Sequence, residues 1–281
     1  LPDWETLPYD EISPHPDLTS ERLQTLFQMT QRVFDINLLP ISTCLHYLPP
    51  RNYIERYCFL FKKKQTVDIV AFKSQLISAG YRYVDKVINH GEYAVRGGII
   101  DLYPMGSTVP YRLDFFDNEI ESIRTFDADT QRSLYPVKEI SLLPARECPL
   151  DEEGIRIFRE NYREAFEGDP SKSRIYKSVS NGIPFSGMEW YLPLFFDSCD
   201  LIFDYLDSSD QIFYLDSFES CAENYWSEAS KRFKLFAYDA ERPILEPEKV
   251  LIKIDIFLNK LHSFDHVQKI KKNEFMLENL A

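Results

Sequence analysis

Hydrophobic and polar residues alternate most clearly near the middle of the chain, in residues 111–116, YRLDFF. A strand with this pattern turns its first, third and fifth side chains to one face, and Arg112, Asp114 and Phe116 to the other. We interpret the first face as core, and the second as a polar face that ends in a large aromatic side chain. An aromatic residue beside an arginine is typical of a protein-binding surface. The alternative is that Phe116 packs under a neighbouring loop.

Strand-like alternation continues on both sides of this segment and predicts an α+β unit over residues 57–143. A strand near residues 58–62 and a helix that Gly80 can end precede the other strands. The pair Asp117-Asn118 is typical of a hairpin turn. Because α/β segments flank the unit, we expect its two ends to lie close together, as in a domain inserted into a parent fold. The remaining strands are predicted at residues 83–88, 93–103, 111–116, 122–126 and 139–143.

Apolar residues return to helical spacing on either side of this unit, in residues 1–56 and 144–263. In the first part a proline-rich opening leads to a helix, and residues 38–41 have the composition of a buried strand end. In the second part, residues 201–203 and 212–215 are short and apolar enough for buried parallel strands. These two parts are expected to form one parallel α/β fold.

The composition narrows the class of protein without identifying it. Of the 281 residues, 44% are hydrophobic, which is ample for about two domains with cores of their own. The 32 basic and 45 acidic residues give a net charge of −13, which repels phosphate backbones and argues against nucleic-acid binding as the main function. The polar residues 264–281 are expected to form a linker or a truncated tail.

Cysteine spacing and hydropathy bear on the cellular compartment. The five cysteines are scattered, without the two-residue spacing typical of zinc sites, so free thiols in a reducing cytoplasm are the simplest interpretation. No apolar run reaches the roughly 18 residues that a membrane-spanning helix needs. The chain also does not begin with the basic and then apolar residues of a signal peptide. We therefore expect a cytoplasmic protein without membrane association. Because the chain begins without methionine inside a segment that resembles a folded region, we also expect a piece of a larger protein.

Six stretches of sequence together resemble one known family over nearly the whole chain. They are residues 3–10 (DWETLPYD), 13–15 (SPH), 20–23 (SERL), 91–129, 142–147 (LLPARE) and 187–196 (GMEWYLPLFF). The family is that of the bacterial transcription-repair coupling factors (Mfd), ATP-driven translocases that remove stalled RNA polymerase and summon nucleotide excision repair. The resemblance is to their amino-terminal, UvrB-homologous region.

This resemblance implies a degenerate helicase-like (RecA-like) parallel α/β fold with an inserted α+β domain, as in domains 1a, 2 and 1b of UvrB. Residues 1–56 and 144–263 correspond to the 1a-like and 1b-like parts, and residues 57–143 to the inserted domain. In the family, the inserted domain binds the excision-repair protein UvrA. The UvrA-binding residues that are carried over by match are Arg96, Arg112 and Phe116.

The expected roles of these residues follow from their chemistry. An arginine can place two hydrogen bonds on a partner carboxylate, while an aromatic side chain fills a pocket. Because Arg112 and Phe116 are predicted on the outward face of their strand, their replacement is expected to spare the fold. Glu121 and Arg124 are expected at the rim of the interface, and a surface salt bridge is the alternative for Arg124.

A nucleotide site of the UvrB kind requires a phosphate loop, in which glycine directly precedes lysine, and none of the nine glycines does so here. By resemblance, Asp216 matches the aspartate of the Asp-Glu pair in UvrB, whereas Ser217 stands where the glutamate orients the attacking water. We interpret Asp216 as the cap of the following helix, with Glu219 three residues on. The resemblance therefore implies no catalysis and no cofactor in this chain, and it assigns ATP and magnesium to motor domains elsewhere in the full-length protein.

The leading hypothesis is a non-catalytic adaptor that recruits UvrA to stalled RNA polymerase for transcription-coupled nucleotide excision repair. RNA polymerase and DNA would bind through other domains of the full-length protein. The same surface is compatible with an autoinhibitory contact with the carboxy-terminal part. The alternative is a fragment of a UvrB-type DNA-binding helicase, which requires a phosphate loop, the Asp-Glu pair and a hairpin that clamps DNA.

Overall fold

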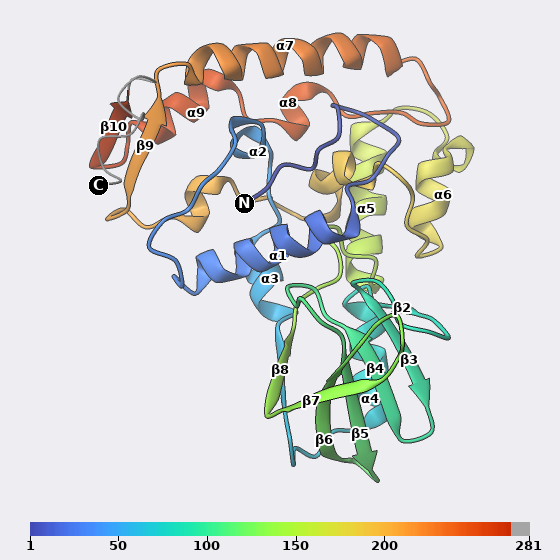
Figure 1. Ribbon diagram of the computed structural model, residues 1–281. Coiled ribbons are helices and arrows are strands. Elements are labelled where there is room, and N and C mark those ends of the chain that lie inside the picture. Colours follow the sequence, from blue (N-terminus) through green and yellow to red (C-terminus); the bar gives the residue numbers. More distant parts are fainter. Residues whose placement is uncertain (271–281) are drawn as a thin grey trace.

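The computed structural model describes residues 1–270, which form two lobes (Figure 1). We call residues 59–142 the sheet lobe, and residues 1–58 together with 143–270 the helical lobe. The sheet lobe lies below the helical lobe in Figure 1 and carries most of the strands. The fold is therefore a mixed α/β fold, and this confirms the α/β fold class predicted from the sequence.

The sheet lobe begins and ends at the same place. Its first strand, β1 (Phe59–Lys62), pairs antiparallel with its last strand, β8 (Glu139–Leu142), and Phe59 lies opposite Leu142. This pairing confirms the prediction that the two ends of the α+β unit lie together, as they do when a domain is inserted into a parent fold.

A six-stranded sheet forms the body of the sheet lobe, in the order β2-β3-β4-β5-β6-β7. Only the β2–β3 pair is parallel, and every other neighbouring pair is antiparallel and joined by a short connection. The strands are β2 (Arg82–Tyr83), β3 (Glu92–Arg96), β4 (Ile99–Tyr103), β5 (Tyr111–Phe116), β6 (Glu119–Phe126) and β7 (Ser133–Val137).

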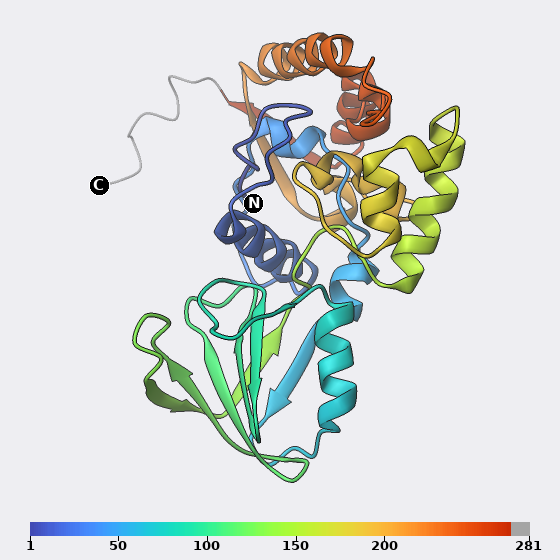
Figure 2. The ribbon, with the colours of Figure 1, turned by 90° about the vertical axis from the view of Figure 1, so that its right-hand side faces the viewer.

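One helix, α4 (Ile69–Ser78), covers one face of this sheet (Figure 2). The Asp68 carboxylate caps its first turn by accepting hydrogen bonds from the backbone N–H groups of the second and third residues of the helix. Gly80, with a φ of +86°, ends it in a left-handed conformation that costs glycine little. Phe72 on the buried side packs against Phe61 and Phe115, with ring centroids 4.5 and 6.4 Å apart. The opposite face of the sheet is left without a helix (Figure 2).

The helical lobe is assembled from short helices and one long helix, α7 (Phe218–Phe236), which crosses the top of the molecule in Figure 1. The small residues Ala222 and Ala229 are fully buried, which allows α7 to lie close to the lobe beneath it. The other helical segments are α1 (Pro16–Thr30), α2 (Ile41–Leu45), α3 (Arg51–Arg56), α5 (Glu152–Ala165), η1 (Pro170–Lys172), α6 (Arg174–Ser180), η2 (Met188–Phe195), η3 (Ile202–Tyr205), α8 (Pro247–Val250) and α9 (Ile254–Leu261).

A buried histidine lies at the centre of the aromatic core of the helical lobe. The ring of His46 contacts Trp4 and Trp190, at centroid distances of 4.5 and 5.0 Å, and its Nε2 lies 2.7 Å from the hydroxyl oxygen of Tyr225. Burial lowers the pKa of His46 to about 3, because the charged imidazolium would lose its hydration there. His46 is therefore neutral at physiological pH.

The depressed pKa of His46 predicts a specific acid sensitivity. The unfolded chain takes up a proton below about pH 6.5 and the folded chain does not, so stability is full above that pH and falls as the pH drops towards 3. We expect a loss of about 3 kcal/mol between about pH 6.5 and pH 4. Urea unfolding across this range measures the loss, and His46→Gln should remove most of it. An equal pH dependence in both proteins would contradict the assignment.

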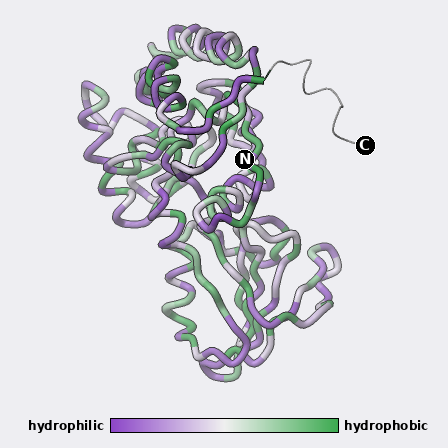
Figure 3. The backbone as a smooth tube through the Cα atoms, turned by 90° about the vertical axis from the view of Figure 1, so that its left-hand side faces the viewer, coloured by the Kyte–Doolittle hydropathy of each residue, from purple (hydrophilic) through white to green (hydrophobic). Residues whose placement is uncertain are grey.

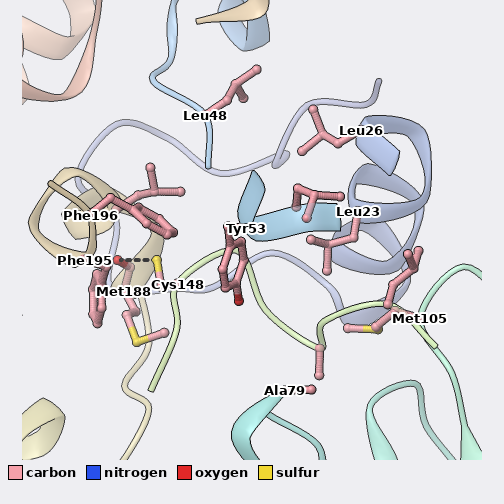
Figure 4. Packing of buried hydrophobic residues seen from close by; sticks show 14 of the residues in the cluster. Leu23, Leu26, Leu48, Tyr53, Ala79, Met105, Cys148, Met188, Phe195 and Phe196 are labelled. Atoms are coloured by element: carbon pink, nitrogen blue, oxygen red, sulfur yellow. Dashed lines mark hydrogen bonds between the residues drawn. The ribbon is translucent and has the colours of Figure 1, made fainter. Parts of the chain in front are cut away.

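The hydrophobic core runs through both lobes without a break. Met105 and Ala79 from the sheet lobe meet Leu23 of α1, and Tyr53 lies between them and the helical core (Figure 4). In Figure 3 the central strands of the sheet lobe are hydrophobic, whereas its outer turns are hydrophilic. The two lobes therefore pack directly against each other and share one hydrophobic core.

The structure corrects several predicted elements of the sheet lobe. Residues 93–103 form two strands, because the chain turns at Gly97-Gly98, and residues 83–88 leave the sheet after β2. The strand β7 is not predicted at all. Its residues, SLYPV, do not alternate between apolar and polar side chains, and Pro136 argues against a strand.

The helical lobe differs more from its prediction. Residues 201–203 lead into the 3₁₀ helix η3 rather than forming a strand, and residues 38–41 form a loop and the start of α2. The predicted strand at 212–215 is confirmed as β9 (Gln211–Leu215), which pairs in parallel with β10 (His266–Ile270). The sequence predicts a linker or a truncated tail from residue 264, but residues 266–270 form a strand. Residues 271–281 lie outside the described part. Among residues 1–270, β9 and β10 are the only parallel sheet of the helical lobe, so a helicase-like arrangement stays a prediction.

Candidate protein-binding site

The three residues singled out by sequence lie on one face of the six-stranded sheet, opposite α4. Side chains alternate along β5, so Phe116 follows Arg112 on the same face, while Phe115 faces α4. Ala94 and Phe126 form a small cluster on this face, and the guanidinium of Arg112 lies over the Phe126 ring at 5.1 Å. Arg96, two residues after Ala94 on β3, points to the same side.

Phe116 is the exposed aromatic of this face. It is 71% exposed and ends β5, at the tip of the sheet lobe farthest from the helical lobe (Figure 1). It pairs with Glu119 across the turn Asp117-Asn118, in which Asp117 has a φ of +51°. The structure thus confirms the predicted hairpin turn, and it excludes the alternative that Phe116 packs under a loop of the described chain.

Arg112 is engaged within the protein rather than free. Its Nε and Nη2 donate to the two carboxylate oxygens of Asp101 at 2.7 and 2.9 Å, and Nη1 donates to the Gln131 carbonyl and the Ser133 hydroxyl at 3.3 and 3.2 Å. The side chain of Arg112 is 17% exposed and that of Asp101 is 3% exposed. The hydrogen bonds with Asp101 raise the pKa of Arg112 above its usual value, so the arginine stays charged.

These contacts contradict the expectation that replacing Arg112 spares the fold. Alternation gives the face on which a side chain lies but says nothing of what it meets there. Asp101 lies opposite Arg112 in the register of β4 and β5, so removing the arginine leaves a buried carboxylate without its partner. The signal in the sequence was Asp101 itself, a single carboxylate inside the apolar strand Ile99–Tyr103.

Arg96 is held at the tip of the β3–β4 hairpin, where its Nη2 donates to the Asp85 carbonyl, and its side chain is exposed. Gly98 in the following turn approaches β5 closely. A Cβ atom at this position would lie 2.9 Å from the Phe115 carbonyl oxygen, so only glycine fits there. This close approach brings the Arg96 end of β3 and β4 beside the end of β5.

The two predicted rim residues lie on β6, the strand beside β5. Arg124 is exposed and lies opposite Arg112 in register, so two guanidinium groups share one row of the face. Within residues 1–270, no carboxylate lies within salt-bridge distance of Arg124, which removes the alternative of a surface salt bridge in this part of the chain. Glu121 is exposed at a β-bulge, where the register slips between β5 and β6.

The residues at the degenerate nucleotide position lie in the other lobe. Asp216 follows β9, is exposed, and donates its backbone N–H to the Ile270 carbonyl at 3.0 Å. The cap of α7 is Ser217, and no side chain makes a capping hydrogen bond there, so the predicted capping by Asp216 is wrong. Glu219 lies 3.9 Å from Lys269. Ser217 supplies no second carboxylate beside Asp216 at this strand end.

No three histidine, cysteine, aspartate or glutamate side chains within residues 1–270 are grouped closely enough to hold a metal ion. No helix in this part of the chain combines the length and the apolar character that crossing a membrane requires.

Comparison with known proteins identifies the sheet lobe as a known domain type. The family of the UvrB interaction domain matches residues 59–148, which is the sheet lobe and the junction that follows it. Arg96, Arg112 and Phe116 all fall inside the matched region.

Similar proteins cover nearly the whole chain. A Haemophilus influenzae protein named transcription-repair-coupling factor is 44% identical over 95% of this chain. Proteins of the same name from Escherichia coli and Rickettsia conorii are 40% and 34% identical over 95% and 88% of it. The chain spans 23% of the length of each of these three relatives.

Proposed function

The chain belongs to the family of transcription-repair-coupling factors and contains a UvrB interaction domain, and from this premise we propose that it is a non-catalytic adaptor that captures UvrA through its sheet lobe. In the longer protein, this capture would recruit nucleotide excision repair to stalled RNA polymerase in the cytoplasm. RNA polymerase and DNA would bind other domains of that protein.

The observation that carries the proposal is the exposed Phe116 on the helix-free face of the sheet lobe. A large aromatic side chain on a strand end gains free energy only when a partner buries it, and such residues dominate protein interfaces. Arg96 on the same face supplies a cation for a partner carboxylate. The position at the far tip of the molecule leaves the helical lobe clear of the partner.

In this proposal, Arg112 positions the binding face and does not itself contact UvrA. Its guanidinium is already saturated by Asp101, Gln131 and Ser133, so it has little capacity to pair with UvrA. We infer that Arg112 fixes β4, β5 and the loop before β7 in one arrangement, and that the binding face depends on this arrangement. Arg124, which is exposed beside it, is the arginine of this row that remains available to a partner.

A pull-down with purified UvrA tests the proposal. The immobilised chain should retain UvrA, and Arg96→Ala combined with Phe116→Ala should weaken binding by more than about thirtyfold, because the loss of one interface hot spot alone costs roughly 2 kcal/mol. Tyr238→Ala, which removes an exposed aromatic from the helical lobe, is the matched control and should bind normally. Retention of UvrA by the double variant at the parent level would refute this face as the binding site.

The absence of catalysis in this chain is part of the proposal and has its own test. Because Ser217 stands at the position of the catalytic carboxylate, we expect no ATP turnover above the blank and no rise in melting temperature with millimolar Mg-ATP. A clear thermal shift together with turnover would favour the UvrB-type helicase instead.

We also propose that the face accepts one partner at a time. An intramolecular contact with the carboxy-terminal part of the longer protein would then compete with UvrA for Phe116. Release of UvrA by the added carboxy-terminal part would support this competition, and simultaneous binding of both would exclude it.

A further inference from the structure

A second site lies in the cleft between the two lobes, away from the Phe116 face. The cleft has a volume of about 570 Å³, which falls within the range of small-molecule sites. Segments far apart in the sequence form its walls: the loop before α1, the β2–β3 loop, residues 145–148 of the junction, and residues 184–189. Apolar side chains, among them Met105, Phe185 and Met188, line part of it.

Arg146 is the cation of this cleft. The stem of its side chain lies on the backbone of Gly80, and its Nε donates only a long hydrogen bond, 3.4 Å, to the Gly80 carbonyl. Its two terminal nitrogens have no hydrogen-bond acceptor and no carboxylate partner within residues 1–270. Burial lowers the pKa of Arg146, and the charge of Glu189 in the same cleft opposes that shift.

Glu189 is the acid on the opposite wall. Its carboxyl accepts a hydrogen bond from the Ser13 hydroxyl at 2.9 Å, and that hydroxyl accepts one from the Gly187 N–H at 3.1 Å. Burial raises the pKa of Glu189 to about 7, and the nearby charge of Glu147 adds to the shift. Below neutral pH the carboxyl is therefore protonated and can donate a hydrogen bond into the cleft.

The other charged groups that face the cleft are already paired. Arg82 pairs with Glu92, and Glu147 pairs with the buried Arg22. His90 contacts Asp17 through Nδ1 and the Ser107 carbonyl through Nε2. Once these pairs are set aside, Arg146 and Glu189 remain, and below neutral pH, where Glu189 is protonated, the unpaired charge of the cleft is the positive charge of Arg146.

We propose that the interlobe cleft binds a small organic anion, whose carboxylate or phosphate group lies on Arg146 beside Glu189 and whose apolar part packs against Phe185. A partly buried guanidinium gains two charge-assisted hydrogen bonds from such a group, at terminal nitrogens that have no acceptor within residues 1–270. The polar and apolar walls together favour an anion with a hydrophobic part over an inorganic ion. Because the ligand contacts both lobes, its binding would fix their relative position.

Titration of the 281-residue chain with benzoate and with phenyl phosphate, at constant ionic strength, tests the proposal and distinguishes the carboxylate from the phosphate. Saturable binding of at least one probe is expected, with shifts of backbone amide signals around Gly80 and Gly91. Arg146→Gln should abolish saturation and Arg146→Lys should restore part of it. Arg132→Gln, which removes an exposed arginine of the sheet lobe, is the control and should bind normally.

The pH dependence supplies a readout that a purely structural role of Arg146 would not produce. Protonation of Glu189 removes a negative charge beside the bound anion, so affinity should rise about tenfold from about pH 8 to pH 6. Glu189→Gln should bind at both pH values with the affinity that the parent shows at pH 6. The proposal is overturned if neither probe saturates, if the amide shifts lie elsewhere, or if Arg146→Gln binds like the parent. An unchanged pH response in Glu189→Gln would overturn the role of Glu189.

Discussion

Arg112→Ala is expected to lower the free energy of unfolding by about 3–5 kcal/mol, the usual cost of leaving a buried charge without its partner. Asp101, which is 2% exposed, would lose both of its hydrogen bonds from the guanidinium. The loop at Gln131 and the strand at Ser133 would lose their anchor as well. Urea unfolding with an unchanged slope against denaturant concentration measures the loss.

Arg124→Ala is the matched control for this measurement. Arg124 lies directly opposite Arg112 in register but is exposed and makes no ion pair in residues 1–270. Its replacement should change stability by no more than about 0.5 kcal/mol. Equal stability of the Arg112→Ala variant and the parent would mean that Asp101 finds another partner, and the positioning role of Arg112 would then be wrong.

Glu147→Ala is expected to cost a similar amount, about 3–5 kcal/mol, in the helical lobe. Glu147 receives hydrogen bonds from Arg22 at 2.6 and 3.2 Å and from the Trp4 indole at 3.2 Å. The side chains of Arg22 and Glu147 are 1% and 2% exposed. This pair ties the opening segment and α1 to the junction that leaves the sheet lobe, so its loss should loosen three segments together.

An exposed pair nearby serves as the comparison for Glu147. Arg56 and Glu153 lie 3.0 Å apart with more than half of each side chain exposed, so Glu153→Ala should cost no more than about 1 kcal/mol. Replacing both buried partners, by Arg22→Met with Glu147→Leu, should recover much of the loss because no unpaired charge is left. A double variant less stable than Glu147→Ala alone would contradict this electrostatic explanation.

The placement of Arg112 and Phe116 on one face of the sheet was predictable because it depends on a local rule. Alternation along residues 111–116 places Arg112 and Phe116 on one side of a strand whatever the rest of the fold does. The turn at Asp117-Asn118 is equally local, and both predictions are confirmed. The partner of Arg112 was not predictable in this way, because the register between β4 and β5 decides which residue it meets.

The predictions that failed involve short apolar segments, whose structure depends on their surroundings. Residues 201–203 are as apolar as a buried strand, but the Asp204 carboxylate accepts the Leu201 N–H at 2.7 Å and stabilises a 3₁₀ turn. Residues 266–270 are too polar to be recognised as a strand, yet they pair in parallel along β9. Periodicity alone does not separate these cases.

The cleft at Arg146 could not be predicted from the sequence. Ser13, Gly80, Arg146 and Glu189 are separated by tens of residues, and only the packing of the two lobes brings them together. Burial, rather than residue type, gives Arg146 and Glu189 their unusual electrostatics. In the sequence, residues 142–147 and 187–196 are notable only because they resemble a family. That resemblance gives no role to Arg146 or Glu189.

The affinity of purified UvrA for the Phe116→Ala variant, measured by titration beside the parent chain and Tyr238→Ala, tests the central claim most directly. The account predicts about thirtyfold weaker binding by Phe116→Ala, with an unchanged free energy of unfolding, since the side chain is 71% exposed and contributes little to the fold. Tyr238→Ala should bind UvrA like the parent. Equal affinity of Phe116→Ala and the parent would contradict the account and exclude this face of the sheet lobe as the site of UvrA capture.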